Sequence, residues 1–194
     1  MTPGPAVSGH RQRFEVSATS IAEWKLTPGT RGDLTFGPVT LRFEGPLGDF
    51  TLREGEAPIL FVAGATGFAP IKSIVEDAFA RGITRPMRLY WGVRKRADLY
   101  ALDLAEQWQR EHANFRVVPV LSEPDPDGAW SGRTGLVHEA MLADFPDLSG
   151  HEVYVCGSVK MVEAAVPAFL AQGLGEGFCF SDAFVPSAPR PGAA

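Results

Sequence analysis

Short apolar runs alternate with longer amphipathic stretches from residue 58 onward. The runs are continuous rather than alternating, which favours strands that are buried on both faces of a sheet. They lie at Ile59–Ala63, Met87–Trp91, Phe115–Leu121 and Val153–Cys156, with a last short one at Phe178–Phe180. Strand, loop and helix in repeated order are typical of βαβ units. The pattern therefore predicts an α/β fold with a doubly wound parallel sheet of about five strands.

The stretches between these runs predict four helices. We expect the first from Pro70 to about Arg81, closed by Gly82, because proline suits a first helical turn and glycine suits the position after a helix. The other three are expected from an N-cap at Asp98 to about His112, from Thr134 to about Ala143, and from about Ser158 to Gln172. Pro167 removes a backbone donor inside the last helix, so we expect a kink or an irregular turn there.

The first 54 residues follow a different pattern, in which glycine and proline interrupt short extended segments. We expect β-like pieces at residues 35–43 and 49–52, and partial disorder before Trp24. This part predicts a small β-rich appendage ahead of the sheet. We place the domain boundary near Gly55 and expect residues 187–194 to form a flexible tail.

Composition narrows the function classes. Hydrophobic residues make up 45% of the 194 residues and charged residues 21%, which is typical of a folded globular chain. The net charge of -5 argues against binding to nucleic acid. The N-terminal residues do not have the pattern of a signal peptide, and no apolar run approaches the roughly 20 residues of a membrane helix. We expect a cytoplasmic protein with no membrane partner.

The residues that bind metals are few and scattered. Two cysteines, Cys156 and Cys179, and four histidines show none of the spacings of zinc or iron–sulfur sites. The sequence therefore predicts no metal site, and any iron–sulfur cluster that works with this chain must lie on another protein.

A glycine-rich turn follows the first predicted strand and leads into the first helix. Gly64 and Gly67 let the backbone approach a pyrophosphate closely, and the helix start offers unpaired N–H groups and the positive end of its dipole. Thr66 can add a hydroxyl donor, and Pro70 begins the helix. A tight turn that binds nothing is the alternative interpretation.

A second candidate site, Cys156-Gly157-Ser158, lies where the fourth predicted strand meets the last helix. Ligands of open α/β sheets bind at the carboxyl ends of strands, where a small side chain can pack beside a nicotinamide ring. A buried cysteine that only fills space is the alternative.

The third candidate segment follows the second strand, where a doubly wound fold places the adenosine end of a dinucleotide. Arg94 or Arg96 can stack on adenine or meet a 2′-phosphate, and Tyr100 can flank the adenine. A solvated loop with an ordinary basic triplet is an equally good interpretation.

Taken in order, five segments resemble the ferredoxin-NADP reductase superfamily. The likeness is closest to its bacterial NAD(P)H:flavin oxidoreductases of the CDP-6-deoxy-delta-3,4-glucoseen reductase and phenol hydroxylase reductase type. The segments are Gly45-Pro46-Leu47-Gly48-Asp49-Phe50, Leu60–Pro70, Tyr90-Trp91-Gly92 with Asp98-Leu99-Tyr100, Cys156-Gly157 with Met161-Val162, and Phe180-Ser181-Asp182-Ala183-Phe184.

The resemblance implies hydride transfer from NADH or NADPH to FAD, followed by electron delivery to an iron–sulfur or oxygenase partner protein. It assigns the pyrophosphate to Gly64, Thr66, Gly67 and Pro70, the adenosine to Arg94 and Tyr100, and the nicotinamide to Cys156 and Gly157. Ser158, which follows them, is also expected to bind the cofactor. It places Asp182 and Phe184 near the flavin ring, which with Cys156 makes them the candidate catalytic residues, and it places Gly45 and Gly48 at the end of the flavin barrel.

Two departures from the family pattern leave alternatives open. About 54 residues precede the nucleotide domain, roughly half of a flavin barrel, and they lack the family's Arg-x-Tyr-Ser motif, so retention of FAD is open. Ser158 also stands where the family usually has proline. The chain is interpreted either as a reductase or as a truncated NAD(P)-binding module without redox turnover of its own, and the choice of NADH or NADPH is open.

Overall fold

The structure, a computed structural model, describes residues 12–13, 42–43, 49–126, 128 and 130–184. Internal contacts divide the chain into two compact units, Met1–Asp49 and Phe50–Ala194. The described part of the first unit is an antiparallel pair, in which β1 (Gln12–Arg13) pairs with β2 (Arg42–Phe43). The second unit carries the parallel sheet.

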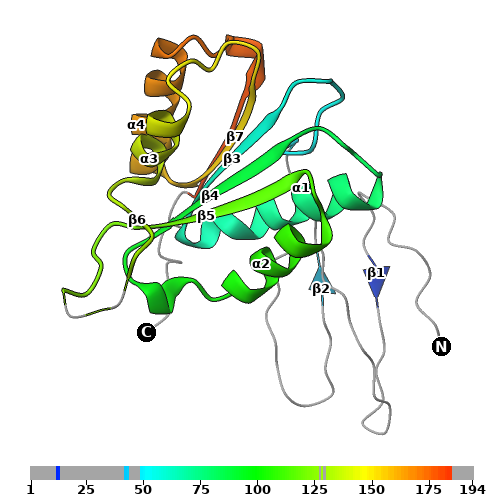
Figure 1. Ribbon diagram of the computed structural model, residues 1–194. Helices are drawn as coiled ribbons and strands as arrows, with labels where there is room; N and C mark the ends of the chain where they lie inside the picture. Colours follow the sequence, from blue (N-terminus) through cyan, green and yellow to red (C-terminus); the bar gives the residue numbers. More distant parts are fainter. Residues whose placement is uncertain (1–11, 14–41, 44–48, 127, 129, 185–194) are drawn as a thin grey trace, which may run out of the picture. The chain divides into compact units, whose positions relative to one another are not determined.

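The described residues of the second unit form a parallel sheet of six strands in the order β6-β5-β4-β3-β7-β8 (Figure 1). The strands are β3 (Ile59–Gly64), β4 (Met87–Val93), β5 (Phe115–Leu121), β6 (Arg133–Thr134), β7 (Glu152–Ser158) and β8 (Cys179–Phe184). The chain extends the sheet from β3 through β4 and β5 to β6, and then returns to the other side of β3 as β7. The order of strands therefore reverses between β3 and β7, which is the topological switch point of a doubly wound sheet.

Helices cover both faces of this sheet, which explains why its central strands are apolar throughout. One face packs against α1 (Phe68–Ala80) and α2 (Leu102–Glu111), and the other packs against α3 (Val137–Asp144) and α4 (Val159–Ala171). Three short 3-10 turns complete the described elements: η1 (Ala65–Gly67), η2 (Arg96–Asp98) and η3 (Glu176–Phe178).

The α/β fold and the five predicted strands are confirmed, and the structure adds a sixth strand. β6 has only two residues and both are exposed, so no apolar run in the sequence predicted this strand. Its register is set by pairing with β5, where Thr134 lies beside Leu121. Thr134, predicted as the start of the third helix, is therefore in a strand, and that helix begins at Val137.

The first helix ends as predicted. Gly82 has a φ of +67°, the left-handed conformation that glycine adopts without strain. Its N–H donates to the Phe79 carbonyl at 3.0 Å, and the Ile83 N–H donates to the Ala78 carbonyl at 2.9 Å. These two bonds satisfy carbonyl groups that the end of α1 would otherwise leave unpaired.

The prediction that Asp98 caps the second helix is wrong. Its carboxylate instead accepts the Lys95 backbone N–H at 3.0 Å within η2, and α2 begins later, at Leu102. At Pro167, where we predicted a kink or an irregular turn, α4 continues without a break. Both Pro167 and Glu163, whose carbonyl loses a hydrogen bond to this proline, are exposed, so water can replace the missing donor.

The two extended pieces predicted in the N-terminal part have different outcomes. Residues 49–52 form no strand, and β2 is the described part of the extended piece expected at 35–43. β1 falls in the stretch before Trp24, where the sequence predicted no regular element. Gly45, Gly48 and the tail at 187–194 lie outside the described residues.

Residues 50–57, which begin the second unit, pack beside the amino ends of its strands. The Arg53 N–H donates to the Tyr154 hydroxyl at 2.9 Å, and the Arg85 guanidinium donates to the Arg53 carbonyl at 2.9 Å. Arg85 also forms a buried ion pair with Glu152 at the start of β7. These contacts tie the segment to the sheet, while the domain boundary near Gly55 stays a prediction.

Candidate functional site

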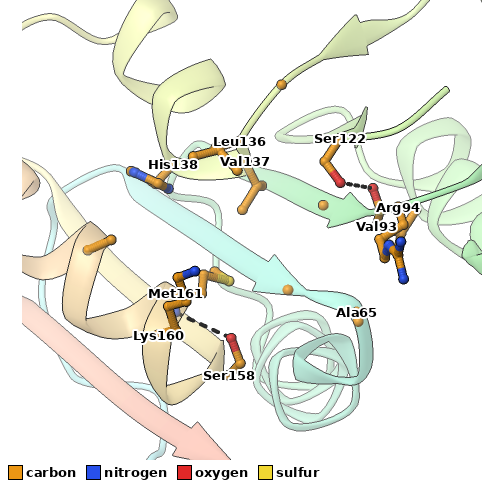
Figure 2. Close-up of a pocket in the computed structure, with 14 residues that line it drawn as sticks. Ala65, Val93, Arg94, Ser122, Leu136, Val137, His138, Ser158, Lys160 and Met161 are labelled. Atoms are coloured by element: carbon orange, nitrogen blue, oxygen red, sulfur yellow. Dashed lines mark hydrogen bonds between the residues drawn. The ribbon is translucent and has the colours of Figure 1, made fainter.

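A cleft of about 400 Å³ opens at the carboxyl ends of the central strands (Figure 2). Its walls come from the loops after β3, β4, β5 and β6 and from the first turns of α3 and α4. The lining residues are Gly64, Ala65, Gly92, Val93, Arg94, Ser122, Gly135, Leu136, Val137, His138, Ser158, Lys160, Met161 and Ala164. This is the edge of the sheet at which doubly wound folds bind their ligands.

The loop after β3 is held in place by the aromatic side chain of Trp91 on β4. The indole Nε1 donates a hydrogen bond to the Ala65 carbonyl at 3.0 Å, and the ring stacks on Phe68 with centroids 4.1 Å apart. Ala65 has a φ of +46°, a strained value for a residue with a side chain. Ala65 and Thr66, the first two residues of η1, are exposed beside the cleft, whereas Gly67 and Phe68 at the start of α1 are buried.

Glycine in this loop permits close contact with the end of β7. A Cβ atom at Gly67 would overlap the carbonyl oxygen of Cys156, and one at Gly64 would overlap the sulfur of Met161. Gly157 is similarly restricted, since a Cβ there would lie 2.7 Å from the same sulfur. The structure thus brings together the two predicted turns, Gly64–Gly67 and Cys156–Ser158, on either side of the switch point.

Ser158 begins the last helix at this edge of the sheet. Its side-chain oxygen accepts the Met161 backbone N–H at 3.3 Å and so caps α4. Lys160 in the first turn is exposed, lines the cleft, and has no ion-pair partner among the residues that the structure describes. The entrance to the cleft therefore carries a capped helix start and a cationic side chain.

Cys156 is fully buried on the opposite face of the sheet from the cleft, among the residues that pack against α1. Burial, with a smaller contribution from the negative charge of Asp182, raises the pKa of the Cys156 thiol to about 12. The thiol is therefore protonated at neutral pH and is a poor nucleophile. This environment suits the predicted packing role and not covalent chemistry.

The other two candidate catalytic residues lie on the neighbouring strand. In the parallel pairing of β7 with β8, Asp182 lies beside Cys156 and Phe184 lies beside Ser158. Asp182 is half-buried and Phe184 is exposed. The three predicted catalytic residues thus gather at one edge of the sheet, outside the lining of the cleft.

The predicted adenosine residues, Arg94 and Tyr100, are placed differently from one another. Arg94 lines the cleft, but its guanidinium is held by Glu123, with Nε donating at 3.0 Å and a terminal nitrogen at 2.7 Å. Tyr100 does not line the cleft. Its ring is 59% exposed and meets the edge of Trp91 with centroids 5.2 Å apart, next to the loop after β3.

Of the predicted site residues, Gly64, Arg94 and Ser158 line the cleft. Four others lie beside the cleft without lining it: Thr66 and Gly67 in η1, Pro70 in the first turn of α1, and Gly157 near the end of β7. Gly45 and Gly48 lie outside the described residues.

The sequence analysis did not predict the cleft wall formed by Ser122 and by residues 135–138. Ser122 directly follows β5, so the rule that ligands bind after strands could have indicated it, although no glycine-rich turn drew attention there. Gly135, with a φ of +103°, turns the chain from β6 into α3 and presents Leu136–His138 to the cleft. That wall depends on a strand that the hydrophobic pattern did not reveal.

The described residues contain neither a candidate metal site nor a helix that could span a membrane. No group of three or more histidine, cysteine or acidic side chains is arranged to hold a metal ion. Within the same residues, none of the helices has the length and apolar character needed to cross a membrane.

A doubly wound parallel sheet with a glycine loop at its switch point is typical of a dinucleotide-binding domain, and its similarity to a family model and to a solved reductase gives it the ferredoxin reductase-like fold. Residues 61–166 match the model of the oxidoreductase NAD-binding domain family, and the chain belongs to this family.

Comparisons with individual proteins agree with this family assignment. The chain is 48% identical over 167 residues to the CDP-6-deoxy-L-threo-D-glycero-4-hexulose-3-dehydrase reductase of Yersinia pestis, covering 84% of this chain and 50% of that protein. It is 34% identical to the reductase component of phenol 2-monooxygenase from a Pseudomonas species, covering 78% and 44%. Among solved structures, an Amycolatopsis cytochrome P450 reductase superposes with a TM-score of 0.70 at 38% identity, covering 76% of this chain and 44% of that one. The chain thus spans about half the length of these relatives.

Proposed function

We propose that this chain is the pyridine-nucleotide half of an electron-transfer reductase. In this function it binds NADH or NADPH at the carboxyl edge of the sheet and positions the nicotinamide for hydride transfer to FAD. The electrons then pass to an iron–sulfur or oxygenase partner protein. The observation that carries the proposal is the meeting of the loop after β3 with the end of β7, directly beside the cleft.

The residues around the cleft fit the parts of a dinucleotide. Ala65 and Thr66, the exposed first residues of η1, directly precede the start of α1, and a helix start suits the negative charge of a pyrophosphate. Lys160 at the start of α4 can add a positive charge. The apolar wall formed by Leu136, Val137 and Met161 offers a surface on which a flat ring can rest.

The residues expected beside the nicotinamide and the flavin have roles that follow from their environment. When bound, the nucleotide supplies a hydride and FAD accepts it. Because the Cys156 thiol is buried, it stays protonated at neutral pH. It therefore does not compete as a nucleophile with the hydride donor and acceptor. Asp182 and Phe184 on β8 are proposed to face the flavin, with the aromatic ring of Phe184 exposed for contact.

Support for the electron acceptor comes from the names of relatives. The matches include the phenol 2-monooxygenase reductase component and the electron transfer component of a xylene/toluene monooxygenase from Pseudomonas putida, which is 36% identical over 154 residues. An oxygenase partner is therefore proposed for this chain. The cytoplasmic location of this chain remains a prediction from the sequence.

Absorption spectroscopy tests this function. The purified chain is incubated with excess FAD, desalted, and measured before and after addition of NADH. A retained flavin band that bleaches with NADH is expected if the chain works as a reductase by itself. A chain that binds NAD⁺ in a calorimetric titration but retains no flavin would instead be the NAD(P)-binding module, and one that binds neither would contradict the proposed function.

A further inference from the structure

The sulfur atom of Met161 lies where the two glycine turns beside the cleft meet. A Cβ atom at Gly64 would lie 2.2 Å from this sulfur, and one at Gly157 would lie 2.7 Å from it. Neither position therefore accepts a side chain while the sulfur stays there. The Met161 thioether fills the space above both glycines, and the same side chain forms part of the lining of the cleft (Figure 2).

The start of α4 sets the direction of this side chain. The Ser158 side-chain oxygen accepts the Met161 N–H at 3.3 Å, which fixes residue 161 in the first turn of the helix. Side chains on a helix lean towards its amino end, so Met161 reaches back over the end of β7 towards β3. The position of the sulfur beside the glycines thus follows from the geometry of the helix start.

Met161 differs in accessibility from the other methionines that the structure describes. Met87 is 2% exposed and Met141 is fully buried, so both thioethers are shielded inside the core. Met161 is partly exposed, and the cleft gives small dissolved molecules access to it. An oxidant that reaches a thioether converts it to a sulfoxide, which is polar. Among the described methionines, Met161 is therefore the one that is open to oxidation in the folded protein.

We infer that Met161 is a modification site, at which oxidation to the sulfoxide by hydrogen peroxide weakens nucleotide binding. The sulfur attacks one peroxide oxygen and forms an S–O bond while the O–O bond breaks. The sulfur loses two electrons and the peroxide gains them, and the leaving hydroxide takes the remaining proton to give water. This inference rests on the proposed function, which also supplies the oxidant, since two electrons and two protons that reach O₂ yield hydrogen peroxide.

The added oxygen has no room on the side of the glycines. The backbones of Gly64 and Gly157 already lie against the sulfur, so the oxygen must separate the two turns or project into the cleft. Separation disturbs the loop that is proposed to hold the pyrophosphate. Projection puts a polar atom into the apolar space lined by Leu136 and Val137, where the flat ring is proposed to rest. Both arrangements lower the affinity for the nucleotide.

Peroxide treatment of the full chain, followed by calorimetric titration with NAD⁺, tests this inference without flavin or turnover. Mass spectrometry after digestion is expected to find the added oxygen on Met161 before it appears on Met87 or Met141. The NAD⁺ affinity should fall at least about fivefold as Met161 is oxidised. Met161→Gln, which places a polar group at the same site, should likewise bind NAD⁺ at least about fivefold more weakly than Met161→Leu.

Met161→Leu removes the sulfur and keeps a side chain of similar volume. Whatever its affinity for NAD⁺, that affinity should be the same before and after peroxide treatment, which excludes oxidation of the cysteines as the cause. Met141→Leu keeps Met161 and is the matched control, so it should lose affinity on treatment as the unmodified chain does.

Three results would overturn the inference while the proposed function stands. They are slower oxidation of Met161 than of the two buried methionines, an unchanged NAD⁺ affinity once Met161 is oxidised, and an equal loss of affinity in treated Met161→Leu. A chain that binds no NAD⁺ before treatment would overturn both the inference and the proposed function.

Discussion

Gly67 has a steric role at the switch point, because the loop after β3 passes directly over the end of β7. A methyl group at this position would overlap the Cys156 carbonyl, and backbone cannot move aside as a flexible side chain can. Gly67→Ala is therefore expected to lower the free energy of unfolding by about 1–3 kcal/mol and to weaken NAD⁺ binding.

Urea denaturation and calorimetric titration measure these two effects. Gly177→Ala is the control, since a Cβ at Gly177 meets no atom within 4 Å. A Gly67 variant as stable as the Gly177 variant would contradict the close approach seen in the structure.

The Cys156 thiol gives a pH-dependent prediction at the same scale. Its pKa of about 12 lies above the ordinary value of a thiol, so the folded state holds the proton more tightly than the unfolded chain does. Its contribution to stability is present below about pH 9 and is lost as the pH rises towards 12. Cys156→Ala should therefore show a shallower loss of stability between pH 9 and 11 than the unmodified chain.

Thiol labelling offers an independent check on Cys156. The native protein should react slowly with iodoacetamide at pH 8, and unfolding in urea should accelerate the reaction at this residue. Mass spectrometry after digestion distinguishes Cys156 from Cys179. Rapid labelling of native Cys156 would mean that the thiol is accessible and ionisable, contrary to its burial.

At the scale of elements, the start of α4 depends on Ser158. Its side chain accepts the Met161 N–H, so Ser158→Ala should cost about 1 kcal/mol of stability. Ser158→Thr retains the oxygen and should cost less. Urea denaturation of both variants provides the comparison, and equal losses would show that the cap is not the source of the effect.

The elements also show what the sequence could predict. Central strands such as β3 are buried on both faces and appear as continuous apolar runs, so their positions follow from the hydrophobic pattern. β6 has two exposed residues and exists through its pairing with β5, so no local signal marks it. The cleft wall that follows β6 was missed for that reason, whereas Gly64 and Ser158 were found because each lies in a turn that directly follows a predicted strand.

The ion pair between Arg94 and Glu123 was also not predictable from the sequence. Arg94 and Glu123 are 29 residues apart, and only the alignment of β4 with β5 makes them neighbours. The sequence indicated a basic triplet that could meet a phosphate, and it could not show that carboxylates already occupy those cations.

At the scale of the whole molecule, the ion pair of Arg85 with Glu152 joins residues 53–57 to the amino ends of β4 and β7. Both side chains are buried, and the Tyr154 hydroxyl also donates to Glu152 at 2.8 Å. Glu152→Gln leaves the Arg85 cation without its counter-charge and should cost about 3–5 kcal/mol.

The exposed pair of Glu54 with Arg81 supplies the control for this variant. Glu54 is 86% exposed, so Glu54→Gln should cost about 1 kcal/mol or less. Urea denaturation compares the two variants. Similar small costs for both would show that the Arg85–Glu152 pair does not anchor the segment ahead of β3.

The location of the bound nucleotide is the central claim, and hydrogen–deuterium exchange with and without NAD⁺ tests it most directly. Saturating NAD⁺ is expected to slow exchange in the loop at residues 64–69, after β4 at 92–95, and at 157–162 at the start of α4. The amino ends of β3 and β7 should be unaffected. Protection confined to other parts of the chain, or none at saturating NAD⁺, would contradict a nucleotide site at the carboxyl edge of the sheet.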